Sequence, residues 1–435
     1  MALGGGKWLF QNKIIPGAYI NVISKGLASV RLSDRGVSAV PIISDWGQDG
    51  KVFKVESGEF QTDSMELFGY EYTSPKLKYI REIFQHGQTV YFYRINSGEK
   101  AENDLARAKH SGIRGNDLKI IVEVDPDDET GFVVETLLDL RVVDTQKVKT
   151  ADELVDNQYV EFIATTLTVN VGKPLANGSN STEVKGADYQ EFLDKIDGLS
   201  FNTLACPTAD DLIKNLFFNF TTRMRDEVGG FFQTVMYDNE NKYDHEGIIT
   251  VANECISDDS YAGVYWLTGA ESSVEVNKTL SNDTYNGELE FDTDYKQSEL
   301  EELIEDGRLV FHTVGEEVRI LLDINNFTSF SDDKQEEFRN NQVVRVFDGL
   351  GLELALIFNN KYNGHIPNDT AGRESFWSDI VDINRQYEDI RAIEDFDSSE
   401  LEVYEGRHDG AVVVNNPVNV TTAMTHLYAT IILKD

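Results

Sequence analysis

The sequence predicts a multidomain protein of mixed α+β and α/β type. We expect an α/β core built from the N- and C-terminal parts, an inserted β-domain and extended β-arms at the two ends. Strand-like and helix-like segments alternate through residues 186–330, which is typical of a mostly parallel sheet flanked by helices. Residues 101–185 instead hold strand-like runs separated by Gly, Asp and Asn turns. Apolar side chains alternate along residues 423–433 as they do in a β-strand.

The N-terminal part contains a predicted arm, residues 1–20, and a predicted domain, residues 21–100. In the arm, three glycines precede apolar anchors, which are Trp8, Leu9, Phe10, Ile14 and Ile15. The domain has predicted strands at 19–24, 37–44 and 89–95 and a helix at 75–84, where Leu77, Ile80 and Phe84 recur at helical spacing. Strands near both termini with few partners favour pairing with another copy of the chain.

The middle of the chain contains the predicted outer β-domain, residues 101–185, and an α/β domain, residues 186–330. Strands of the β-domain are predicted at 119–124, 130–137, 140–143 and 159–171. In the α/β domain, helices are predicted at 189–196, 209–227 and 298–305, strands at 201–206, 231–236 and 247–252, and a hairpin at 309–314 and 318–324. Gly229 and Gly230 mark the expected end of the second helix.

Two helices are predicted in a C-terminal core domain, residues 331–410, and two strands in a C-terminal arm, residues 411–435. The first helix covers 332–347 and is followed by Gly349 and Gly351. The second is amphipathic, with apolar residues at Phe376, Ile380, Ile383, Tyr387 and Ile390. The strands are predicted at 411–414 and 423–433, with a turn at Asn415-Asn416-Pro417.

Charge and composition exclude several classes of function. The 435 residues carry a formal net charge of −37, spread along the whole chain, which repels nucleic acid phosphates and argues against DNA or RNA binding. No apolar run approaches the roughly 20 residues of a membrane span, and we expect no direct membrane insertion. The two cysteines, Cys206 and Cys255, are expected in the core rather than in a disulfide.

A search for catalytic or metal-binding motifs is mostly negative. The sequence has no phosphate-binding loop, no dinucleotide fingerprint, no nucleophile elbow and no zinc spacing among its seven histidines. His245 and Glu246, next to Asp244, could hold a metal or form an ordinary polar loop. Residues 125–129 could bind calcium or form a solvated turn, but lack the EF-hand layout. We therefore predict no enzyme, no cofactor and no metal.

Several segments resemble contractile phage tail sheath proteins, in the order that this family uses. They are IPGAY at 15–19, GIRGN at 112–116, the Ala262-Gly263 segment, residues 318–325, and the terminal strands DGAVVV and MTHLYATI. The resemblance runs over nearly the whole chain and is strongest to shorter sheaths of Gram-positive myophages, defective prophages and phage-tail-like bacteriocins.

The resemblance implies a mechanical function without nucleotide hydrolysis. Sheath subunits stack as six-membered rings in a helical sheath around a tail tube, and their terminal arms complete sheets in neighbouring copies. Contraction then drives the tube through a cell envelope. The implied partners are other copies of the chain, the tube protein, and baseplate and tail terminator proteins. The implied location is a virion or phage-tail-like particle assembled in the host bacterial cytoplasm.

The arm residues follow from this hypothesis. We expect the five N-terminal anchors to dock on a neighbour, and the C-terminal strands to be donated or to receive a strand, although they could pair within one subunit. The C-terminal residues are Val412, Val413, Val414, Tyr428, Ile431, Ile432 and Leu433. Arg339 and Arg345 are basic residues in an acidic chain and could face an acidic tube or form surface ion pairs.

Two other functions remain open at this point. An acidic α/β hydrolase could hide a site that the sequence does not reveal. A tail tube or baseplate protein would share the partners but would not contract. Tube proteins are usually much smaller, which argues against that alternative.

Overall fold

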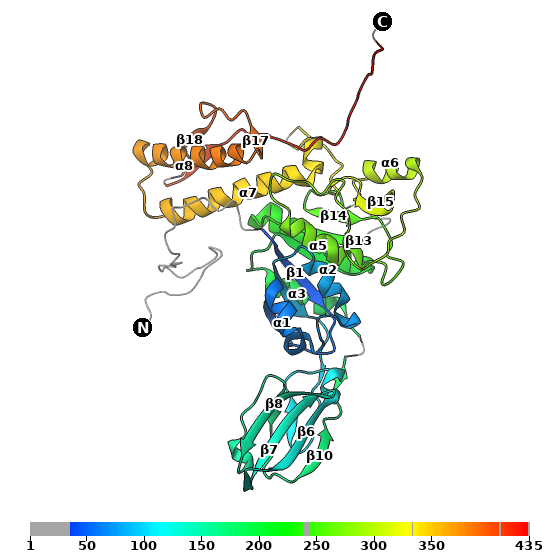
Figure 1. Cartoon of the computed structure of the whole chain (residues 1–435). Coiled ribbons are helices and arrows are strands. Elements are labelled where there is room, and N and C mark those ends of the chain that lie inside the picture. The colour runs from blue at the N-terminus through cyan, green and yellow to red at the C-terminus, as the bar shows by residue number, and fades with distance from the viewer. Residues whose placement is uncertain (1–34, 182, 238–242, 333, 409, 434–435) are drawn as a thin grey trace. The chain divides into compact units, whose positions relative to one another are not determined.

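The computed structural model describes residues 35–181, 183–237, 243–332, 334–408 and 410–433 (Figure 1). The chain divides into two compact units. One contains residues 39–84 and 88–197, and the other contains residues 198–435 with 85–87 and the segment that ends at Ser38. None of the helices in the described ranges has the length and apolar character needed to cross a membrane.

The first part of the 39–197 unit packs helices on strands through aromatic side chains. β1 (Val37–Ile42), β3 (Thr89–Arg94) and β2 (Val52–Glu56) are neighbours in this order, and β2 runs antiparallel to β3. Phe60 of α1 (Ser57–Phe68) stacks on Phe84 of α2 (Lys78–Phe84), and both helices reach Phe92 of β3 through Phe68 and Phe84. The sequence analysis did not predict α1 and β2.

The predicted outer β-domain forms a four-stranded antiparallel sheet in the order β10–β6–β7–β8 (Figure 1). Its strands are β6 (Leu118–Asp125), β7 (Asp128–Leu138), β8 (Arg141–Val148) and β10 (Asn170–Pro174). Two short pairs accompany it, β5 (Ala106–Ala108) with β9 (Val160–Phe162), and β4 (Gly98–Glu99) with β11 (Ser179–Asn180). Leu118, Ile120 and Val122 point into one core, as the two-residue repeat of a strand requires.

The long strand predicted at 159–171 is wrong. Only β9 and β10 form there, and the backbone N–H groups of Ile163 and Ala164 both donate to the Leu105 carbonyl oxygen. A run of β-favouring residues is not a strand where no partner lies alongside it. α3 (Gly186–Ile196) closes this unit, as predicted, and Phe192 packs against Tyr93.

The 198–435 unit contains the predicted parallel strands. β12 (Thr203–Cys206), β13 (Gln233–Tyr237) and β14 (Ile248–Val251) pair in parallel and are buried along their whole length. α4 (Asp211–Arg223) continues into the π-helical turn Met224–Val228, which ends at Gly229 with φ 86°. Burial on both faces is typical of a parallel sheet covered by helices, and α5 (Gly263–Ser273) is itself almost entirely buried.

The N-terminal end of the described chain packs against the 198–435 part of this unit. The backbone N–H of Asn202 donates to the Val37 carbonyl at 2.8 Å, and the Arg35 guanidinium donates to the carbonyls of Glu271 and Val274. α6 (Gln297–Glu305) and the hairpin of β15 (Phe311–Val314) and β16 (Glu317–Ile320) complete the α/β part. The multidomain α/β architecture with an inserted β-domain is therefore confirmed.

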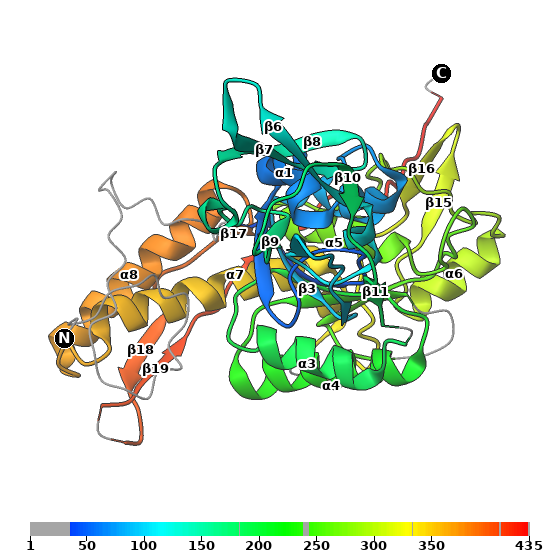
Figure 2. The ribbon, with the colours of Figure 1, turned by 90° about the horizontal axis from the view of Figure 1, so that it is seen from below.

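Two helices dominate the C-terminal part, where they run side by side (Figures 1 and 2). They are α7 (Asn341–Ile357) and α8 (Thr370–Asp389), and Val346, Leu350, Ile383 and Tyr387 form their shared core. The predicted limits of the first helix, 332–347, are wrong. A 3₁₀ turn at Glu336–Arg339 comes first, and the Asn340 side chain caps α7 by accepting a hydrogen bond from the Gln342 N–H.

Gly349 and Gly351 lie inside α7 and do not end it. A Cβ at Gly349 would lie 2.5 Å from the Tyr387 hydroxyl oxygen, and a Cβ at Gly351 would lie 2.8 Å from the Phe231 ring. These glycines therefore serve close packing, at the cost of helix propensity.

We predict that Gly349→Val destabilises the fold by about 1–3 kcal/mol, because two methyl groups would collide with the buried Tyr387 ring. Urea unfolding measures the change. Gly58→Val is the matched control, since a Cβ at this exposed helical glycine meets nothing within 4 Å, and it should change stability by less than about 0.5 kcal/mol. Equal effects at the two positions would contradict the packing argument.

Candidate functional site

The C-terminal segment after α8 alternates between paired and unpaired backbone. β17 (Ile393–Glu394) pairs antiparallel with β20 (Asn419–Val420), and β18 (Glu402–Glu405) pairs antiparallel with β19 (Val412–Asn415). The chain then leaves the two helices as an extended strand-like trace (Figure 1). This part of the molecule carries most of the predicted arm residues.

Residues 424–433 are extended but belong to no sheet within the described ranges. Their large apolar side chains are almost fully exposed. The exposed fractions are Met424 102%, Leu427 89%, Tyr428 92%, Ile431 97%, Ile432 81% and Leu433 90%. Exposed apolar side chains on an extended segment are typical of surfaces that pair with another chain.

The predicted strand Val412–Val414 pairs within its own chain, through β18. Val403, Val412 and Val414 pack toward the core of α8, against residues such as Phe376 and Ile380. Tyr404 and Val413 stand opposite each other on the other face. Because β18 and β19 form a two-stranded sheet in the described structure, each keeps one edge without a strand beside it. A two-stranded hairpin is marginally stable alone, and a further strand would extend it.

A cavity of about 230 Å³ lies beside the start of β19. Val412 lines it together with Phe358, Tyr362 and Ile366, which lie between α7 and α8, and Phe376 of α8. The cavity is apolar enough to accept a side chain such as Ile or Leu. The hairpin and its cavity thus form a surface suited to receiving an extended apolar segment.

Arg345 is not at a tube-facing surface, contrary to one sequence-based prediction. It is 1% exposed, and its guanidinium donates to Glu271 Oε2 at 2.7 Å, to Asp323 Oδ2 at 2.7 Å and to the Lys278 carbonyl at 2.8 Å. Its partners lie on α5, in the segment that follows α5 and in the segment before α7. A buried cation that binds two buried carboxyl groups acts as an internal joint and is unavailable to a partner protein.

The two carboxyls that share Arg345 differ in their proton affinity. Burial, reinforced by the Asp323 charge, raises the pKa of Glu271 well above its usual value. Burial also opposes the ionisation of Asp323, but attraction to Arg345 and several hydrogen bonds lower its pKa to about 2. Asp323 therefore supplies the charge that balances Arg345, and Asn341 Nδ2 donates to its second oxygen at 2.8 Å.

Arg339, the other predicted tube-facing residue, is half-buried in the 3₁₀ turn before α7. Its guanidinium donates to the Ile304 carbonyl. The N-terminal anchors Trp8, Leu9, Phe10, Ile14 and Ile15 lie outside the described residues. They remain predictions.

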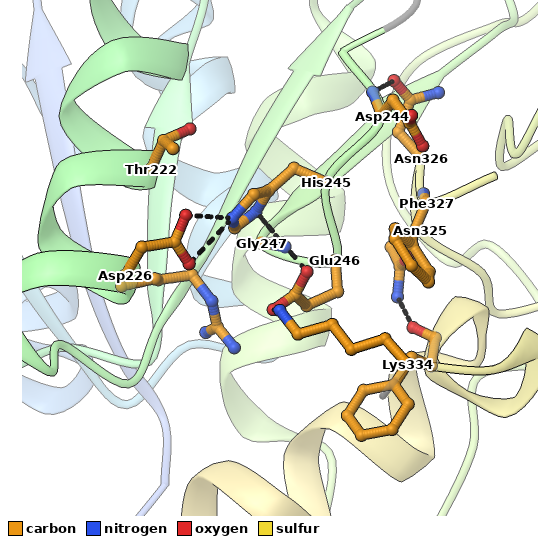
Figure 3. Close-up of polar contacts among 12 residues, drawn as sticks. Thr222, Asp226, Asp244, His245, Glu246, Gly247, Asn325, Asn326, Phe327 and Lys334 are labelled. Atoms are coloured by element: carbon orange, nitrogen blue, oxygen red, sulfur yellow. Dashed lines mark hydrogen bonds and ion pairs between the residues drawn. The ribbon is translucent and has the colours of Figure 1, made fainter. Parts of the chain in front are cut away.

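Asp226, His245 and Glu246 form the cluster with metal-ligand character in the described ranges (Figure 3). His245 Nε2 lies 3.4 Å from both Asp226 oxygens, and Glu246 pairs with Lys334. The Gly247 N–H donates to His245 Nδ1 at 2.9 Å, so the neutral ring carries its proton on Nε2, the nitrogen that a cation beside Asp226 would need. A lysine on one ligand and a proton on another disfavour a cation, and the polar-loop interpretation fits better.

Sequence reasoning missed Gln342, whose side-chain amide binds the main chain at the root of the exposed segment. Its Oε1 accepts from the Ala423 N–H at 3.1 Å. A buried glutamine in the first turn of a helix leaves no periodic or compositional signal, so only long-range contacts reveal it.

Comparisons with known proteins agree with this geometry. Four tail sheath domains match successive parts of the chain. They are the Gp18 domain III N-terminal region at residues 35–95, the β-sandwich domain at 96–180, the central domain at 182–326 and the C-terminal domain at 333–434.

Solved structures and curated proteins point to the same family. A sheath tail protein from Desulfitobacterium hafniense is 30% identical with a TM-score of 0.78, covering 93% of this chain and 100% of its own. One from Listeria innocua is 29% identical with a TM-score of 0.78, covering 89% and 92%. The phage-like element PBSX protein XkdK of Bacillus subtilis is 29% identical over 422 residues, covering 88% of this chain and 89% of its own.

The chain belongs to the phage tail sheath protein family and is a structural sheath protein. The contracted helical sheath of the anti-feeding prophage shares the fold at 13% identity, with a TM-score of 0.54 over 97% of this chain. Nothing in these comparisons supports the hydrolase alternative.

We predict that Arg345→Met destabilises the fold by about 3–5 kcal/mol, because it leaves the Asp323 carboxylate buried without its counterion. Urea unfolding measures the loss. The control is Arg339→Met, which removes the same charge from the 3₁₀ turn before α7. It should lower the stability by about 1 kcal/mol or less. If the two variants unfold at the same urea concentration, Arg345 is not the joint described here.

Proposed function

We propose that this protein is the contractile sheath subunit around a phage-type tail tube, and that its copies interlock by strand exchange. The observation that carries the proposal is the exposed apolar strand at 424–433, which has no partner in its own described chain. The β18–β19 hairpin of a second copy offers matching open edges and an apolar cavity. Main-chain hydrogen bonds would supply direction, and alternate side chains would fill pockets.

An open chain of such contacts builds a tube, since each copy donates at one place and receives at another. Heterologous contacts of this type generate helical assemblies rather than closed dimers. We propose stacked six-membered rings, with the N-terminal anchors Trp8, Leu9, Phe10, Ile14 and Ile15 as a second donated arm. The division into arms and domains at residues 20, 100, 185, 330 and 410 belongs to the same proposal.

The work of contraction comes, in this proposal, from new contacts between copies and not from a catalysed reaction. The extended sheath is then a metastable state, and a contracted state with larger lateral interfaces releases energy that drives the tube through the target envelope. The proposed partners are the tube protein, the baseplate and the tail terminator, and Arg339 is the proposed tube-facing residue. Assembly in the host bacterial cytoplasm into a virion or phage-tail-like particle completes the proposal.

We predict that Leu427→Asp combined with Ile431→Asp blocks assembly without unfolding the subunit. The two side chains lie on one face of the extended segment and are exposed in the single chain, so the substitutions cost no described contact. Losing two buried aliphatic side chains at an interface costs about 3 kcal/mol, or about 100-fold in the association constant. Negative-stain microscopy counts striated hollow cylinders, and circular dichroism checks the fold.

The control for this variant is Leu140→Asp combined with Val171→Asp, which adds the same charge at two aliphatic side chains that are 90% and 99% exposed and lie outside residues 424–433. We expect cylinders of normal length from the control. Cylinders of normal length from the double variant would overturn the proposed role of residues 424–433.

Deletion of residues 1–15 tests the second arm. We expect dispersed subunits or short rings, since the five apolar anchors would be lost while the described fold begins only at residue 35. Long sheaths from the truncated protein would show that the N-terminal arm is not required.

A further inference from the structure

A single buried glutamine connects three distant segments at the base of the C-terminal strand. Gln342 lies in the first turn of α7 and is 1% exposed. Its Nε2 donates to the carbonyls of Asn277 and Thr421, each at 3.1 Å, and its Oε1 accepts from the Ala423 N–H at 3.1 Å. Both donor hydrogens and the acceptor are used, so the orientation of the amide is determined by its partners.

Within the described residues, Ala423 is the last one that makes a hydrogen bond to another segment of the chain. On the side opposite Gln342, the Thr421 N–H donates to the Ala392 carbonyl at 3.0 Å, and Val420 pairs with Ile393. Beyond Ala423, the hydrogen bond described joins two neighbours, Thr425 and His426. The base of the exposed strand is therefore held from two sides, and residues 424–433 pair with no other strand in the described part of the chain.

The hydrogen bonds of Gln342 to Thr421 and Ala423, here called the clamp, have two physical consequences. Each backbone residue that stays ordered before docking saves about 1–2 kcal/mol of conformational entropy when a partner binds. The clamp also keeps the strand away from the β18–β19 hairpin of its own subunit, which is a competing site. Few residues lie between β19 and Met424, so the strand starts close to this hairpin. An unanchored strand so close to the open hairpin edges of its own chain would meet them at a high effective concentration.

We propose that Gln342 is the positioning residue that sets the direction in which residues 424–433 leave the subunit, and so favours a second copy of this chain over the subunit's own β18–β19 hairpin. The inference rests on the proposed strand exchange. A buried amide that only stabilised α7 would have no reason to bond the main chain on both sides of residue 422.

The test compares Gln342→Met with Gln233→Met in the full chain. Gln233 is a matched control because it is also a buried glutamine in the same unit, 4% exposed, with its Nε2 donating to the Glu246 carbonyl and to Asn341 Oδ1. Both variants keep side-chain length and lose their hydrogen bonds, so both should lower the midpoint of urea unfolding.

Two readouts separate positioning from stability. Amide hydrogen exchange of the unassembled subunit should show a loss of protection of at least tenfold at Ala423 in Gln342→Met alone. The protein concentration needed to form cylinders should rise at least tenfold for Gln342→Met and less than threefold for Gln233→Met. If Gln342→Met does not fold, Gln342→Asn, which is one methylene too short to reach all three partners, carries the same comparison.

Equal assembly by the Gln342 variant and its control would overturn this inference. The proposed function would still stand if the Leu427→Asp and Ile431→Asp variant failed to assemble in the same experiment. Normal cylinders from that double variant as well would overturn both.

Discussion

The buried pairing of Arg345 with Glu271 and Asp323 is the interaction on which the C-terminal half of this protein depends. It joins α7 to α5 and to the segment before α7, and Arg225 adds a second link through a bidentate pair with Asp348 at 2.8 and 2.9 Å. α7 in turn supports α8, the β18–β19 hairpin and the clamp at Gln342. A force on the exposed strand would therefore pass through Gln342 into α7. From α7, the ion pairs of Arg345 and Arg225 would transmit it to the α/β part that contains the parallel strands.

The large negative charge constrains how copies can associate. A subunit with a net charge of −37 repels its neighbours, although at physiological ionic strength this repulsion is screened beyond about 8 Å. Contacts between copies must therefore be short-range and directional. A donated strand satisfies both conditions, because its hydrogen bonds are local and its exposed side chains at 427–433 are uncharged.

Several elements were predictable because their signals are local. α8 follows from apolar residues at three- and four-residue steps, the parallel strands from short apolar runs between helices, and the end of the α4 region from Gly229. The long strand predicted at 159–171 and the early start predicted for α7 failed for a common reason. Residue type shows what a segment favours, but a neighbouring strand or a cap such as Asn340 decides what it forms.

The candidate site divides in the same way. By itself, the sequence determined the apolar alternation of residues 427–433 and the β-character of 412–414, since both depend on the order of adjacent residues. Only the tertiary structure decided that β19 pairs with β18 while residues 424–433 join no sheet of the described chain, and that Arg345 is buried by partners 74 and 22 residues away. The same holds for Gln342, whose role depends on a carbonyl 65 residues before it and on main-chain atoms about 80 residues after it. Such contacts form between segments that fold together, and no local pattern records them.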